Sequence, residues 1–77
     1  MTIQVFAVLK EHFDKEFELG DDVKDIAALQ NRLSQLNAEA DSVLRISRFA
    51  VNNEFVDPDY AIKTNDTICI FPPSSGG

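Results

Sequence analysis

The sequence predicts an α+β domain in which one main helix packs across one face of a mixed sheet and a short C-terminal tail projects from the fold. Three observations lead to this prediction. β-branched and aromatic residues form short runs near both ends of the chain, as strands require. One amphipathic helical pattern lies between those runs. The last six residues, Pro-Pro-Ser-Ser-Gly-Gly, fit neither pattern.

Two strands joined by a polar turn are predicted at the N-terminus. Residues 2–8 are rich in strand-forming residues, with Ile3 on one face and Phe6 on the other, and we expect both faces to be partly covered. Residues 10–14 are polar and predict a turn or a single helical turn. Residues 15–19 predict the return strand of a hairpin.

The clearest helix is predicted to begin at Asp22. Asp22 can act as the N-cap, with Asp25 three residues later as a variant of the capping box. Apolar residues then recur at spacings of three, four and three, which places them on one face of a helix that ends near Asn37. These residues are Ile26, Leu29, Leu33 and Leu36. The stripe spans less than two heptads, so it indicates core packing.

The second half of the chain predicts three further strands. Residues 38–44 form a connector with room for a short helical turn. The Asn52-Asn53 pair predicts a hairpin turn, because Asn tolerates the left-handed backbone region. If the last strand lies beside the first, the arrangement is a β-grasp, with the helix covering one face. The predicted strands are residues 47–51, 54–56 and 67–71.

The tail is set apart from the domain, so we expect a domain over residues 1–71 and a tail over residues 72–77. Pro72 and Pro73 carry no amide hydrogen, which ends the sheet and favours an extended polyproline path. Extended, the tail reaches at most roughly 20 Å beyond the last strand. The four residues that follow the prolines add neither bulk nor an apolar anchor: Ser74, Ser75, Gly76 and Gly77.

The composition argues against several classes of function. Asp and Glu number 13 against 7 Lys and Arg, a net charge of −6, so the basic stripe that nucleic acid needs is missing. The acidic balance suits docking on a basic protein surface and equally suits simple solubility. Cys69 is the only cysteine, which indicates a reducing, cytoplasmic setting. We expect no signal peptide and no membrane span.

No side-chain pattern predicts an active site within the domain. His12 and Cys69 are single, and there is no phosphate-binding glycine loop and no cluster of metal ligands. The C-terminal carboxylate of Gly77 is the remaining candidate. It is ionised at neutral pH, with a pKa of about 3.5, and needs activation, for instance as an acyl-adenylate. Gly76 and Gly77 suit that chemistry because a chain without side chains can enter a narrow channel. A diglycine end taken alone is also compatible with a plain flexible end.

Three stretches of the sequence resemble the MoaD family, the small sulfur-carrier subunits of molybdopterin synthase. The first segment and the helix also fit, so the resemblance covers essentially the whole chain. The turn at residues 64–66 departs from the usual Asp-Gly-Asp, and Asp22 stands where Ser or Thr is common. Neither departure puts the function in doubt. The three stretches are FAVNNEFV at residues 49–56, NDTI at residues 65–68 and FPPSSGG at residues 71–77.

The resemblance implies a function for the tail. An E1-like enzyme of the MoeB type would adenylate the Gly77 carboxylate with ATP, and a sulfur donor would convert it to a thiocarboxylate. A large subunit of the MoaE type would use that sulfur to convert cyclic pyranopterin monophosphate to molybdopterin. The chain would be the sulfur-donating subunit of a heterotetrameric sulfurtransferase, with no stably bound cofactor, no metal and no active site of its own.

Docking requires a surface as well as a tail. Phe71 lies at the base of the tail, and we expect Phe6 and Phe49 to flank it on the sheet face away from the helix. The alternative is that Phe6 and Phe49 belong to the core. The predicted partner-binding residues are Phe6, Phe49, Phe71, Pro72, Pro73, Ser74 and Ser75.

Three other functions remain open at this point. A sulfur carrier of the thiamine pathway also has a β-grasp and a terminal diglycine, although such proteins tend to be shorter and to lack the Pro-Pro pair. A ubiquitin-like modifier would join its tail to lysines of target proteins. A plain binding module would make no use of its tail.

Overall fold

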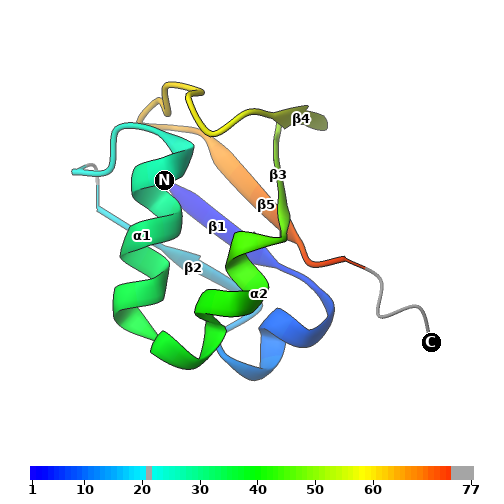
Figure 1. Ribbon diagram of the computed structural model, residues 1–77. Coiled ribbons are helices and arrows are strands. Elements are labelled where there is room, and N and C mark those ends of the chain that lie inside the picture. The colour runs from blue at the N-terminus through cyan, green and yellow to red at the C-terminus, as the bar shows by residue number, and fades with distance from the viewer. Residues whose placement is uncertain (21, 74–77) are drawn as a thin grey trace.

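The computed structural model describes residues 1–20 and 22–73, so Asp21 and residues 74–77 lie outside the described part. Figure 1 shows an open sheet with the helices gathered on one of its faces. Along the chain the elements are β1 (Thr2–Val5), the 3-10 helix η1 (Ala7–Glu11), β2 (Glu16–Glu18), α1 (Ile26–Leu36), the 3-10 helix η2 (Ala38–Ala40), α2 (Asp41–Arg45), β3 (Arg48–Val51), β4 (Glu54–Val56) and β5 (Thr67–Phe71).

The sheet contains five strands in the order β2-β1-β5-β3-β4. The two central strands, β1 and β5, run parallel, whereas the outer pairs are antiparallel. Parallel neighbours need a long connection, and here α1 and α2 form part of it across one face. The first and last strands are therefore adjacent, as the predicted β-grasp requires.

The core lies between the helices and one face of the sheet. Alternate residues of the central strands point into it, and α1 contributes residues at spacings of three and four. The side chains of the strands and of α1 therefore pack together in one apolar layer. Fully burying an Ile or Leu side chain contributes about 1.5–3 kcal/mol each. The fully buried side chains include Ile3, Val5, Leu9, Ile26, Leu29, Leu33, Leu44, Ile68 and Ile70.

The first strand ends earlier than predicted. It stops at Val5, and Ala7 takes a positive φ of 54° that breaks the strand. The chain then forms η1, which buries Leu9 completely, so core packing overrides the strand preference of this segment. Within β1 both faces are at least partly covered, as predicted, whereas Phe6 and Val8, which lie beyond the end of the strand, are exposed.

The predicted N-cap of the helix was wrong by three residues. Asp25 is the N-cap of α1, and its Oδ1 accepts a hydrogen bond from the backbone nitrogen of Ala28 at 2.8 Å. Asp22 instead forms an ion pair with Arg32. Asp25 is held extended, with φ −147°, in a bridge to Ala61, and so the helix cannot begin earlier.

The later elements follow the prediction more closely. The hairpin turn has positive φ at both Asn52 and Asn53, at 53° and 67°. The bounds predicted for β4 and β5 match the structure, and β3 begins at Arg48, one residue later than predicted. The connector forms η2 and α2, which bury Ala40 and Leu44. No helix in the described ranges is both long and apolar enough to cross a bilayer.

Candidate functional site

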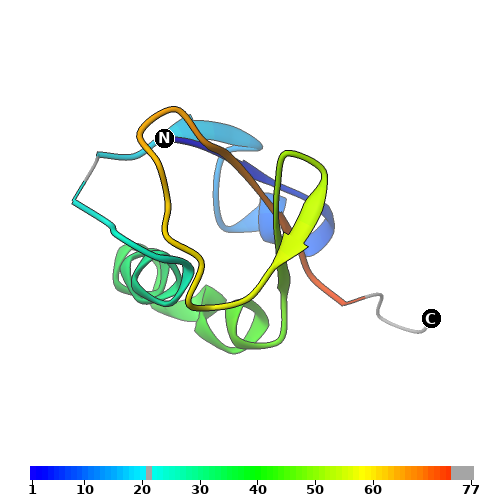
Figure 2. The ribbon, with the colours of Figure 1, turned by 90° about the horizontal axis from the view of Figure 1, so that it is seen from above.

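One face of the sheet is left open by the described part of the chain. Figure 2 shows α1 and α2 on the same side of the strands. The alternation that buries Ile68 and Ile70 in β5 turns Cys69 and Phe71 toward the other face. A sheet face with exposed apolar side chains is a candidate binding surface.

Three phenylalanines form an aromatic patch on this open face, and the term is used below for Phe6, Phe55 and Phe71. The rings of Phe6 and Phe71 are stacked, with centroids 4.6 Å apart and an interplanar angle of 10°. The ring of Phe55 meets that of Phe71 edge-on, with centroids 6.0 Å apart. Their exposed fractions are 37%, 54% and 36% for Phe6, Phe55 and Phe71. Exposed aromatic rings held in fixed positions are typical of binding hot spots.

The prediction that Phe49 belongs to this surface was wrong, whereas Phe6 and Phe71 lie on it. Phe49 is 6% exposed and belongs to the core. Its neighbour Ala50 takes the open face instead, opposite Phe55 of β4 and Cys69 of β5. Successive residues of a strand point to opposite faces, so only one of Phe49 and Ala50 can face outward.

Phe55 is the patch residue that the sequence prediction missed. A signal for it was present, because the two-residue turn at Asn52-Asn53 pairs Phe49 with Val56. Phe55 must then face opposite to Phe49, so a core position for Phe49 places Phe55 on the open face.

Arg48 holds Phe55 in position. Its guanidinium carbon lies 3.7 Å from the centre of the Phe55 ring, in cation–π geometry. Arg48 also pairs with Phe71 across the β3–β5 ladder. The patch is therefore supported at one side by a fixed positive charge.

Cys69 lies on the same face and is not arranged as a nucleophile. Its Sγ donates a hydrogen bond to Oε1 of Gln4 at 3.3 Å. Burial raises the pKa of the Cys69 thiol, which keeps the unreactive protonated form at neutral pH. A hollow of about 180 Å³ adjoins it, and the described residues that line it are all uncharged: Ala50, Asn53, Phe55, Cys69 and Phe71.

The tail begins at the aromatic patch. β5 ends at Phe71, and Pro72 and Pro73 follow without sheet pairing. Figure 1 shows the chain leaving the body of the fold at this point. Pro72 is half-buried and Pro73 is exposed. Four of the predicted site residues lie outside the described residues: Ser74, Ser75, Gly76 and Gly77.

The remaining chemistry-bearing side chains form no second centre in the described part of the chain. No three His, Cys, Asp or Glu side chains in those ranges are grouped as a metal site would require. His12 closes η1, and its carbonyl accepts a hydrogen bond from Nδ2 of Asn37 at 3.1 Å. His12 and Cys69 lie on different elements and share no hydrogen bond.

Comparison with known proteins agrees with this arrangement. Residues 3–77 match the model of the ThiS family. The molybdopterin synthase sulfur carrier subunit of Dictyostelium discoideum is 36% identical over 80 residues, which cover 97% of this chain and 93% of the relative.

Two solved structures have the same fold. SAMP1 from Haloferax volcanii superposes with a TM-score of 0.80 at 20% identity, covering 99% of this chain and 97% of that one. A chain of the complex of subunits 1 and 2 of molybdopterin-converting factor from Helicobacter pylori gives a TM-score of 0.70 at 22% identity, covering 99% and 96%. The predicted ubiquitin-like β-grasp is confirmed.

Proposed function

This chain belongs to the ThiS family, and we propose that it is the sulfur carrier subunit of a molybdopterin synthase. The observation that carries the proposal is the 36% identity to a subunit of that name along nearly the full length of both chains. The position of the tail supports it, because the tail leaves the fold beside an exposed aromatic patch.

The proposed reaction takes place at the Gly77 carboxylate. A carboxylate is a poor electrophile, so an E1-like enzyme first joins it to AMP with ATP and releases pyrophosphate. A donor that supplies sulfur at the sulfide level then attacks the acyl carbon through that sulfur, the bond to AMP breaks and AMP leaves, which produces a thiocarboxylate. The chain itself needs no bound cofactor for these steps, and we place the cycle in the cytoplasm.

The sulfur is used in a larger catalytic subunit. One structural neighbour comes from a complex of subunits 1 and 2 of molybdopterin-converting factor, which supports a large-subunit partner for this chain. We propose that the aromatic patch docks on that subunit while the tail enters its pterin pocket. The large subunit then supplies the groups that convert cyclic pyranopterin monophosphate to molybdopterin, in a heterotetramer with two carriers.

The three alternative functions are less well supported. The family match alone leaves the thiamine pathway open, whereas the named relative favours the pterin pathway. The likeness to SAMP1 concerns the fold, and nothing in the described residues favours conjugation to target lysines. A binding module with an unused tail would not need its tail to begin at the aromatic patch.

The test has two stages. The purified chain is first incubated with the activating enzyme, ATP and a sulfur donor, and its intact mass should rise by the exchange of one oxygen for sulfur. The product is then mixed with the large subunit and cyclic pyranopterin monophosphate, and molybdopterin should form. Failure of the first stage with an enzyme that activates another carrier would contradict sulfur transfer. Success followed by use of a thiazole precursor, and not of the pterin, would assign the thiamine pathway.

A further inference from the structure

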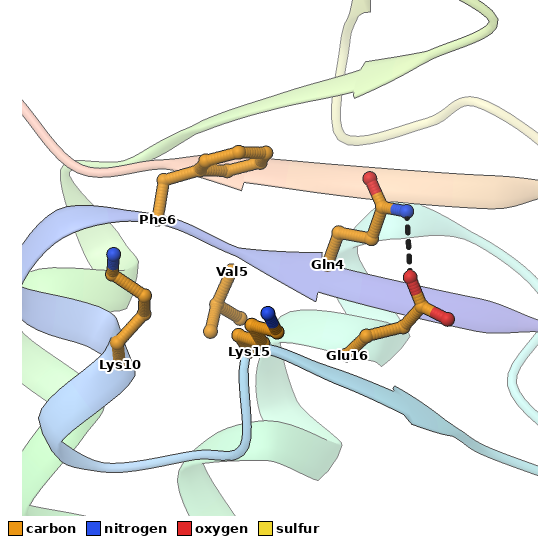
Figure 3. Close-up of a pocket in the computed structure, with 6 residues that line it drawn as sticks. All are labelled: Gln4, Val5, Phe6, Lys10, Lys15 and Glu16. Atoms are coloured by element: carbon orange, nitrogen blue, oxygen red, sulfur yellow. Dashed lines mark hydrogen bonds between the residues drawn. The ribbon is translucent and has the colours of Figure 1, made fainter.

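Two lysines, Lys10 and Lys15, line a hollow of about 200 Å³ that also includes Phe6 in its wall. Figure 3 shows Lys10 and Lys15 on its wall. Two backbone hydrogen bonds bring them there. The Val5 nitrogen donates to the Lys15 carbonyl at 3.0 Å, and the Leu9 nitrogen donates to the Phe6 carbonyl at 3.2 Å, which turns the chain back at η1.

Lys10 and Lys15 take part in no side-chain ion pair within the described part of the chain, where Arg32 and Arg45 each have a carboxylate partner. Glu16 also lines the hollow, but its Oε1 accepts a hydrogen bond from Nε2 of Gln4 at 2.9 Å. In Figure 3 this pair lies at the opposite end of the hollow from Lys10, and Lys15 lies between them.

Lys10 and Lys15 are distinguished by their place, because both line one small hollow beside an exposed aromatic ring. Like charges on one small wall repel each other, and an anion placed between them removes that repulsion. The hollow is too small for a large ligand but large enough for one carboxylate side chain and its water.

The hollow is continuous with the aromatic patch, because Phe6 belongs to both. A partner that covers the patch therefore reaches the hollow as well. Charged groups at the rim of a hydrophobic contact raise the association rate and fix orientation. The side chains on the β2 side of the same face are acidic and already bonded: Glu16 to Gln4 and Glu18 to Thr2.

We propose that Lys10 and Lys15 receive a carboxylate side chain of the large subunit when that subunit docks on the aromatic patch. The inference rests on the proposed function and adds the chemistry of the partner surface: an apolar area bordered by Asp or Glu. The contact with the two lysines fixes the orientation of the docked chain, so that its tail starts on the side of the large subunit where the pterin pocket opens.

The test compares two double charge reversals. Lys10→Glu with Lys15→Glu removes the proposed contact, and Lys24→Glu with Lys63→Glu is the matched control, since Lys24 and Lys63 are exposed and line none of the hollows described above. Both variants change the net charge equally. Binding of each full chain to the large subunit is measured by calorimetry at low and at high salt, and the thermal midpoint checks the fold.

We expect the first variant to bind roughly tenfold more weakly than the control at low salt, with the difference shrinking at high salt. Lys10→Arg with Lys15→Arg should retain binding. Equal affinities of the two charge-reversal variants, or tighter binding of the first, would overturn the inference while leaving the proposed function in place. If the unmodified chain does not bind the large subunit, both the proposed function and the inference fail.

Discussion

Phe71 contributes to the stability of the fold and, in the proposed function, to binding of the large subunit, and the two contributions can be measured separately in one variant. Its ring lies between those of Phe6 and Phe55, and it is still 36% exposed. Removing it takes away an exposed ring and leaves the core intact. Phe71→Ala should therefore lower the free energy of unfolding by only about 1 kcal/mol.

Binding should respond far more strongly to the same substitution. If the aromatic patch is the docking surface, Phe71→Ala weakens binding to the large subunit about 30-fold, as expected for a central hot spot. Calorimetry measures the affinity and urea unfolding the stability. Leu36→Ala is the control, because Leu36 is also exposed, at 58%, but belongs to α1. Equal affinities of the two variants would show that the patch is not the docking surface.

Tyr60 is the only tyrosine, so its ionisation can be followed directly. Its hydroxyl donates a hydrogen bond to Oδ2 of Asp66 at 2.9 Å, and this bond to a carboxylate raises the pKa of Tyr60 above 10.0. The unfolded chain then loses the phenolic proton first as the pH rises. The contribution of this bond to stability is complete below pH about 10 and is lost as the pH rises through the folded pKa.

Ultraviolet absorbance of tyrosinate should give a midpoint above that of the urea-unfolded chain. Tyr60→Phe should remove this part of the alkaline loss of stability. A midpoint equal to that of the unfolded chain would contradict the hydrogen bond.

At the residue scale, the limit of sequence prediction is illustrated by Phe49 and Phe55. Both are aromatic, both lie in predicted strands, and composition does not distinguish an inward from an outward ring. The assignment depends on which face of β3 meets the helices, and that is set by strands far away in the sequence. The orientation of Phe71 was easier to predict, because the expected core position of Ile70 places the next residue of the strand on the opposite face.

At the element scale, turn chemistry was a better guide than periodicity. The turn at Asn52-Asn53 fixes β4 to within a residue, and Pro72 fixes the end of β5. The start of α1 could not be fixed in this way, because Asp22 and Asp25 are equally good caps by composition. The bridge between Asp25 and Ala61 decides between them, and it forms only in the folded chain.

The two aspartates should therefore differ in mutant stability. Asp25→Ala removes the hydrogen bond to the Ala28 nitrogen and should cost about 1 kcal/mol. Asp22→Ala removes an exposed ion pair with Arg32 and should cost less, with an effect that disappears at high salt. Urea unfolding at low and high salt measures both. A larger loss for Asp22→Ala would show that the helix begins earlier than the structure indicates.

The ion pairs that Arg32 of α1 and Arg45 of α2 form also predict how the free energy of unfolding changes at acid pH. A hydrogen bond from Arg32 holds the pKa of Asp22 below its usual value, and Arg45 does the same for Asp41. Each contribution is present above the pKa of the unfolded carboxylate, about 3.9, and is lost as the pH falls through the folded pKa. Stability should therefore decrease mainly below pH 4.

At the scale of the whole molecule, the domain and the reactive end are expected to be separable. Among the described residues the core extends from Met1 to Ile70 and includes neither Pro72 nor Pro73. The aromatic patch and the two lysines of the hollow also lie before the tail. A chain that lacks Gly76 and Gly77 should thus keep its thermal midpoint and its affinity for the large subunit, while losing the carboxylate that we propose as the sulfur acceptor.

The truncated chain should therefore act as an inhibitor. Removing both glycines should abolish molybdopterin formation, because the new end, Ser75, carries a side chain and the chain is two residues shorter. Added in excess to a synthase assay with the thiocarboxylated full chain, it should compete for the large subunit and slow product formation. Adding Phe71→Ala to the truncated chain should relieve the inhibition. Undiminished molybdopterin formation by the truncated chain alone would contradict a reactive terminus at Gly77. Inhibition that is unaffected by Phe71→Ala would show that the aromatic patch is not the docking surface.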